Sequence, residues 1–77
     1  MTFEQLLDML RDMHSDIDFE TAQGLIDNKV LTSFDVVSIV AELSESYDLD
    51  IGAVDIVPEN FNSAQALYAL VQRLEDE

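Results

Sequence analysis

A serine followed by an apolar residue, at the point where a loop turns into an amphipathic helix, is the feature of this chain most suited to chemistry. The residues are Ser33 and Phe34, and acidic residues follow them at Asp35, Glu42, Glu45 and Asp48. The start of a helix favours negative charge, because its first backbone N–H groups lack partners and the helix dipole is positive there. A hydroxyl at this position is well placed to carry a phosphate, which makes Ser33 a candidate for covalent modification.

A calcium site is a weaker possibility. Asp48, Asp50 and Glu59 match the first, third and last ligand positions of an EF-hand loop. However, Gly52 stands where a further ligand belongs, and Ala53 stands where the loop needs glycine. We therefore expect no specific metal site, although so acidic a surface can bind divalent cations weakly.

The chain has 77 residues, seventeen acidic and three basic, and a formal net charge of −14. This length predicts a single domain over residues 1–77 and leaves little room for an enclosed active site. So acidic a chain should not bind nucleic acid, whose phosphates require lysine and arginine, but should be attracted to basic protein surfaces. Because 48% of the residues are hydrophobic and recur at helical spacing, we expect a folded domain.

The sequence contains no cysteine, so it offers neither disulfides nor thiolate chemistry. A signal peptide and a long apolar run are also missing, so we expect a cytoplasmic protein that is not embedded in a membrane. We also expect a monomer. An enzyme is not expected, because the single histidine, His14, has no nucleophile paired with it and no glycine-rich loop could hold a nucleotide. His14 reads as an ordinary residue near the end of the first helix.

Three segments show the periodicity of amphipathic helices. The first follows a Thr2–Gln5 capping box and carries apolar residues at Phe3, Leu6, Leu7, Leu10 and Met13. The second spans about Ser33 to Tyr47, with a buried stripe at Val36, Ile39, Val40, Leu43 and Tyr47 and another side formed by Phe34, Val37 and Ala41. The last segment is capped by Asn62 or Ser63. Its inward-facing residues are Ala66, Leu67, Leu70, Val71 and Leu74.

The remaining segments carry residues that interrupt helices. Residues 14–31 predict a long connection with room for one short turn of helix. It should be pinned to the core by its apolar residues, Ile17, Phe19, Leu25, Ile26, Val30 and Leu31. Gly52, Pro58 and Asn60 leave room only for a short turn over residues 53–57. The expected fold class is all-α, a small antiparallel bundle of three main helices plus one short helix.

The segments T-S-F-D-V-V-S-I-V-A-E-L (residues 32–43) and Y-D-L-D-I (residues 47–51) resemble the acyl and peptidyl carrier proteins. In that family a D-S-L-type motif opens the second helix, and its serine carries 4′-phosphopantetheine. The resemblance extends from about Leu25 to Leu74. Within the family, the spacing from Ile51 to Ser63 is most similar to D-alanyl carrier proteins.

The chain departs from the family pattern at the residue before the serine, which is usually aspartate and is Thr32 here. Aspartate and threonine are both good N-cap residues, and Thr32-x-x-Asp35 has the form of a capping box. With Thr32 as the cap, the Ser33 hydroxyl is released from that role and can point to solvent. An acidic contact to the modifying enzyme would be lost, which bears on how efficiently Ser33 is modified.

The resemblance implies a freestanding shuttle rather than an enzyme. A phosphopantetheinyl transferase would move 4′-phosphopantetheine from coenzyme A to Ser33, and the thiol of that arm would hold an acyl or aminoacyl group as a thioester. Further partners would be a loading ligase and an acceptor transferase or synthase with basic surfaces. Partners in this family bind the second helix, so the expected contact residues are Phe34, Asp35, Val37, Ala41, Glu42 and Glu45, with Phe34 as an exposed apolar anchor.

Two other interpretations stay open. The chain could be a carrier-like domain that is never modified and acts as an acidic docking or regulatory module, for which Thr32 is the only indication. It could also be a plain helical interaction domain in which Ser33 is structural. If it is a carrier, an aminoacyl group such as D-alanine is favoured over a fatty acyl group, which would need a deep cleft.

Overall fold

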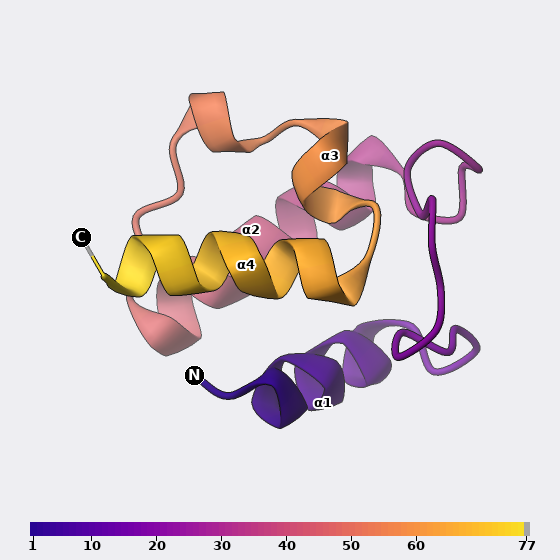
Figure 1. The fold of residues 1–77 in the computed structure, drawn as a ribbon, viewed down its shortest axis with the longest axis horizontal. Helices are drawn as coiled ribbons and strands as arrows, with labels where there is room; N and C mark the ends of the chain where they lie inside the picture. The colour runs from indigo at the N-terminus through magenta and orange to yellow at the C-terminus, as the bar shows by residue number, and fades with distance from the viewer. Residues whose placement is uncertain (77) are drawn as a thin grey trace.

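Residues 1–76 are described by a computed structural model, and the chain within them is helical (Figure 1). The elements are α1 (Phe3–Met13), α2 (Ser33–Tyr47), the 3₁₀ turn η1 (Ala53–Asp55), α3 (Pro58–Phe61) and α4 (Ala64–Glu75). None of the described residues lies in a strand, which confirms the expected all-α class and is compatible with a small helical bundle. No helix in this part of the chain has the length and apolar character needed to cross a membrane.

The three long helices begin where the sequence predicts, because each has a hydroxyl cap. Thr2 Oγ1 accepts from the Gln5 N–H at 3.2 Å, and Gln5 reaches back to the Thr2 N–H at 2.8 Å. Ser63 Oγ accepts from the Ala66 N–H at 3.0 Å, so Ser63 rather than Asn62 caps α4. At its other end α2 stops at Asp48, whose backbone is left-handed with φ of 54°.

The connection between α2 and α4 differs from the prediction. The short turn expected over residues 53–57 is present as η1, but the separate helix α3 that follows it and begins at Pro58 was not predicted. Proline fits the first helical position because its missing N–H would have no partner there. Treating Pro58 only as a helix breaker was therefore wrong. This helix contributes the buried ring of Phe61 to the core.

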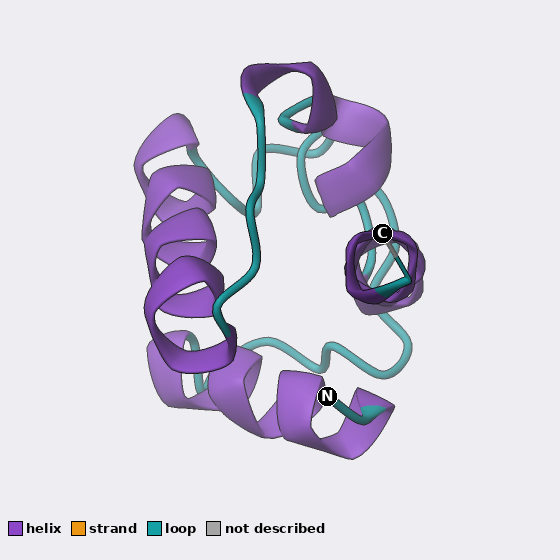
Figure 2. Cartoon of the chain, turned by 90° about the vertical axis from the view of Figure 1, so that its left-hand side faces the viewer, coloured by secondary structure: helices purple, strands orange, loops and turns teal. Residues whose placement is uncertain are grey.

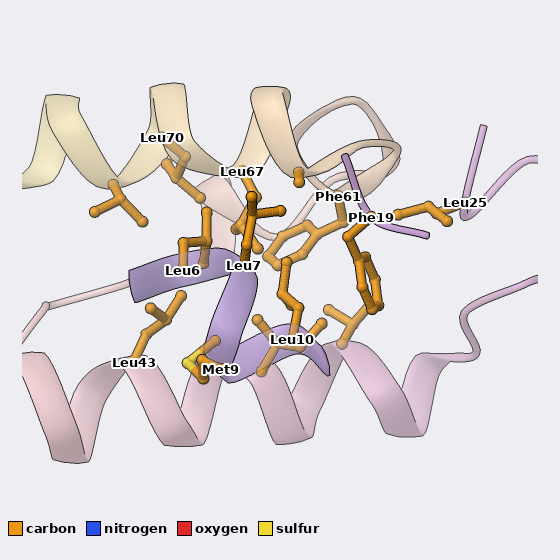
Figure 3. Packing of buried hydrophobic residues seen from close by; sticks show 14 of the residues in the cluster. Leu6, Leu7, Met9, Leu10, Phe19, Leu25, Leu43, Phe61, Leu67 and Leu70 are labelled. Atoms are coloured by element: carbon orange, nitrogen blue, oxygen red, sulfur yellow. The ribbon is translucent and has the colours of Figure 1, made fainter. Parts of the chain in front are cut away.

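The hydrophobic core contains buried side chains from α1, α2 and α4. Figure 2 shows that the helices are arranged around the centre of the molecule. Side chains of α1, among them Leu6, Leu7 and Leu10, lie between Leu43 of α2 and Leu67 and Leu70 of α4 (Figure 3). The predicted inward stripes are fully buried at Val36, Ile39, Leu43, Leu67, Leu70 and Val71 and half-buried at Val40, Tyr47, Ala66 and Leu74.

The connection over residues 14–31 runs without a helix but is attached to the core. Its predicted anchors are buried at Phe19, Leu25 and Leu31 and half-buried at Ile17 and Ile26. Val30 is exposed, so its predicted anchoring role was wrong. The cause is local, because Lys29 adopts a left-handed backbone with φ of 61°, and the chain turns there so that Leu31 rather than Val30 faces the core.

Asn62, at the junction of α3 and α4, holds this connection in place. Its carbonyl accepts from the Leu25 N–H at 2.8 Å, and its side-chain Oδ1 accepts from the N–H groups of Ile26 and Asp27 at 2.9 and 3.1 Å. Its Nδ2 donates to Asp27 Oδ2 at 3.2 Å. One asparagine thus satisfies three successive backbone donors and fixes the segment that leads into α2.

Asn62→Ala should lower the free energy of unfolding by about 1–3 kcal/mol, because two backbone N–H groups lose their acceptor. Urea titration followed by circular dichroism measures the change. Asn28→Ala is the matched control, since Asn28 is an exposed asparagine of the same connection. Equal stability of the two variants would contradict the anchoring role of Asn62.

Candidate functional site

Ser33 occupies the first position of α2, and its side chain is exposed. Thr32 precedes it as the N-cap, and its Oγ1 accepts from the Asp35 N–H at 3.3 Å. Asp35 Oδ2 in turn accepts from the Thr32 N–H at 2.9 Å and from the Thr32 hydroxyl at 3.0 Å. The predicted capping box is therefore confirmed. Within residues 1–76, these bonds at the start of α2 leave the Ser33 hydroxyl unused.

The capping box also decides which backbone donors remain free. A helix begins with N–H groups that have no acceptor within it. The box satisfies those of Thr32 and Asp35, so the N–H groups of Ser33 and Phe34 remain for another acceptor. They lie at the positive end of a 15-residue helix, where an anion is favoured. The position that carries the hydroxyl is thus also the position suited to a phosphate.

His14, which the sequence analysis set aside, contacts this site. It is the C-cap of α1, and its Nε2 lies 2.8 Å from Asp35 Oδ1. An ionised carboxylate can only accept, so the imidazole is the donor. Both carboxylate oxygens of Asp35 are therefore bound within the protein, and the Asp35 side chain is only 18% exposed. No local sequence pattern could identify this contact, because the two residues are 21 positions apart.

The same contacts set the ionisation of Asp35. The Thr32 backbone N–H, above all, holds the pKa of Asp35 below its ordinary value. Hydrogen bonds from His14 and from the Thr32 hydroxyl act in the same direction, while partial burial opposes them. Asp35 therefore stays ionised at neutral pH and acts as a fixed negative charge inside the first turn of α2.

An open groove of about 260 Å³ lies beside Ser33. Its lining is largely apolar and comes from the loop before α2, the first turns of α2 and the segment that enters α3, namely Ile26, Ser33, Val36, Val37, Ile56, Val57, Pro58 and Phe61. A second hollow, of about 340 Å³, lies on the side of Lys29 and Thr32 and also includes Ser33. Ser33 thus stands between two hollows, of which the apolar one could receive a short organic group.

The predicted contact residues lie on two sides of α2. Phe34 and Val37 are 77% and 64% exposed, and helical spacing places them in one row with the exposed Ala41 and Glu45. Asp35 and Glu42 face another way. Asp35 binds His14, and Glu42 accepts from the Ser46 hydroxyl and borders a hollow lined also by residues of α1.

The sequence analysis missed two exposed apolar residues in the segment between α2 and α3. Val54, in η1, is 86% exposed, and Ile56, just after η1, is exposed at the rim of the groove. The surrounding residues are a mixture of acidic and apolar types, which gave no sign that these two side chains are exposed. Ile56 lines the groove beside Ser33 together with Val37.

The residues that match an EF-hand loop are not gathered into a metal site. Asp48 ends α2, Asp50 lies in the following loop and Glu59 lies in α3. Among residues 1–76, no three histidine, aspartate or glutamate side chains lie close enough to hold a metal ion.

Asp35→Asn should destabilise the protein by roughly 1 kcal/mol near neutral pH, because the reciprocal bond of the capping box is weakened. The pKa of Asp35 is lowered by folding, so its carboxylate contributes stability above the unfolded-state pKa, and this contribution is lost as pH falls through the folded-state pKa. The difference in melting temperature between the parent and the variant should therefore be largest above about pH 5 and shrink below about pH 4. A difference that stays constant from neutral to strongly acidic pH would contradict this account.

Comparison of the chain with protein-family models, with curated proteins and with solved structures found no match. A functional proposal therefore depends on the sequence resemblance and on the geometry around Ser33.

Proposed function

We propose that this protein is a carrier that bears 4′-phosphopantetheine on Ser33 and shuttles a thioester-bound acyl or aminoacyl group between partner enzymes. One observation carries the proposal: Ser33 is the exposed first residue of α2, while Thr32 and Asp35 perform the capping. A serine needed as a cap would be poorly placed for modification. The resemblance of residues 32–43 to the serine-bearing segment of carrier proteins supports the same role.

The residues around Ser33 fit a phosphodiester. The hydroxyl would provide the attachment oxygen, and the free N–H groups of Ser33 and Phe34 would face the phosphate oxygens at the positive end of α2. Lys29 borders the same hollow as Ser33 and adds a positive charge nearby. The attached group would supply a thiol, which the chain lacks because it has no cysteine.

Attachment is a group transfer in which the chain takes part through one oxygen. Ser33 Oγ forms a bond to the phosphorus of coenzyme A that bears the pantetheine arm. The bond from that phosphorus to 3′,5′-ADP breaks, and the hydroxyl proton passes to a base of the transferase. The carrier itself contributes orientation, because α2 fixes the position of Ser33 relative to its exposed surface.

The groove favours a small cargo. Ligand pockets in proteins usually span about 300–1,000 Å³ and enclose most of the ligand. The groove beside Ser33 measures about 260 Å³ and is open to solvent. Ile56 borders this groove, whereas Leu67 is buried in the core and Ile51 packs against the core, so neither of these two opens a deeper cleft. A short acyl or aminoacyl group, D-alanine among them, suits these dimensions better than a long fatty acyl chain.

The partner surface combines an apolar row with a strong negative field. Phe34, Val37 and Ala41 form the apolar row, which Glu45 continues with an acidic group, and Phe34 is its most exposed large side chain. A net charge of −14 would steer the chain toward basic surfaces on the transferase, the loading ligase and the acceptor enzyme. Glu42 would lie at the edge of the contact, and Asp35 would act through the capping box.

The alternative is an acidic docking module that uses the same apolar row without modification. Thr32, which replaces the family's usual aspartate, is the observation that favours it. Both functions predict partners with basic surfaces, so only the chemistry of Ser33 separates them.

The direct test is the intact mass of the protein after incubation with coenzyme A, magnesium and a transferase of broad specificity. The parent should gain one phosphopantetheine, and Ser33→Ala should gain none, because the acceptor oxygen is gone. Ser38→Ala is the matched control, since it removes a hydroxyl further along the same helix and should leave the gain unchanged.

The Phe34→Ala variant should keep the parental melting temperature but should be loaded with phosphopantetheine more slowly, because the exposed Phe34 ring contributes to enzyme contact rather than to the core.

If the parent gains no mass in the transferase test, and the protein taken from its native cells is also unmodified, the docking module would replace the carrier function.

A further inference from the structure

His14 provides a side-chain hydrogen bond between the end of α1 and the start of α2. Its backbone is fixed, because its N–H donates to the Leu10 carbonyl at 2.9 Å as the last bond of α1. Its ring reaches Asp35 Oδ1 at 2.8 Å, and the ring is only 28% exposed. The position of the Asp35 carboxylate is thus set from outside α2.

Asp35 connects this bond to the residues that precede and include Ser33. One of its oxygens binds His14 and the other binds the N–H and the hydroxyl of Thr32. Each partner therefore restricts the side chain in a different direction. If the bond to His14 is removed, the carboxylate is held only by Thr32, a residue three positions away in the same exposed turn.

The sequence offers α2 a second possible start. Serine is at least as good an N-cap as threonine, so α2 could begin one residue later with Ser33 as its cap. That start would lack a reciprocal carboxylate, because Val36 would stand where Asp35 stands now. The Asp35 carboxylate therefore selects the start at Thr32, and any contact that fixes this carboxylate favours a free Ser33 hydroxyl.

We propose that His14 is a positioning residue for Ser33: by holding Asp35 on Thr32, it keeps the N-cap at Thr32 and the Ser33 hydroxyl free for modification. The effect of His14 on the modification of Ser33 rests on the proposed function. The effect of His14 on the start of α2 does not depend on that function. His14 makes no contact with the transferred group in this account.

Two substitutions separate the hydrogen bond of His14 from its packing. His14→Phe keeps a ring of similar shape but removes the donor, and His14→Gln keeps an N–H donor. Arg11→Gln is the control, because Arg11 lies one turn earlier on α1 and pairs with Asp8 of its own helix. Amide hydrogen exchange, followed by nuclear magnetic resonance, reports on the N–H groups of Thr32 and Asp35.

For His14→Phe we expect exchange at these two amides to accelerate about fivefold, a factor typical of weakening an N-cap. The kcat/KM for loading by the transferase should fall by a similar factor. His14→Gln should recover part of both effects, and Arg11→Gln should change neither. Exchange in the core of α4 should stay at the parental rate in all three variants.

The outcomes distinguish this inference from the proposed function. A parent that is never loaded refutes the carrier function, while amide exchange at Thr32 and Asp35 still decides whether His14 sets the start of α2. A parent that is loaded, with His14→Phe unchanged in both exchange and kcat/KM, overturns the role of His14. Faster exchange throughout α1 and α4 without rescue by His14→Gln also overturns it, since His14 would then serve only overall stability.

Discussion

The reciprocal hydrogen bonding between Thr32 and Asp35 is the interaction on which the candidate site at Ser33 depends. It gives α2 a defined first residue, and that residue is Ser33. Because one residue supplies the cap and the next supplies the hydroxyl, the helix can be stable without using the group proposed to react. His14 extends this arrangement to α1, so the start of α2 is tied to the end of another element.

The hydrophobic core and the contacts of Asn62 stabilise the fold that positions this site. A chain with a net charge of −14 is subject to self-repulsion in its folded state, which the apolar faces of α1, α2 and α4 must outweigh. Asn62 joins the long connection to the junction of α3 and α4, and this places Ile26 at the groove beside Ser33. The groove is therefore built from segments that are separate in sequence, and hydrogen bonds to Asn62 fix the loop around Ile26 to the junction of α3 and α4.

Local signals explain which features could be predicted from the sequence. The spans of α1, α2 and α4 follow from apolar periodicity and hydroxyl caps, and the capping box at Thr32 follows from residue types three positions apart. The start of α3 was missed because a proline can either end a helix or begin one, and neighbouring residues did not decide between them. The bond from His14 to Asp35 depends on how the connection folds back, for which no local pattern exists. The exposure of Val30 follows from the left-handed turn at Lys29, which a lysine does not signal.

The most direct test of the central claim compares the stability of Thr32→Ala with that of Ser33→Ala, measured by urea unfolding at neutral pH. If Thr32 is the cap and Ser33 is free, Thr32→Ala should lose about 0.5–2 kcal/mol, and Ser33→Ala should stay within about 0.5 kcal/mol of the parent. The reverse order, with the larger loss at Ser33, would show that the serine caps α2 and would contradict the arrangement on which the proposed modification depends.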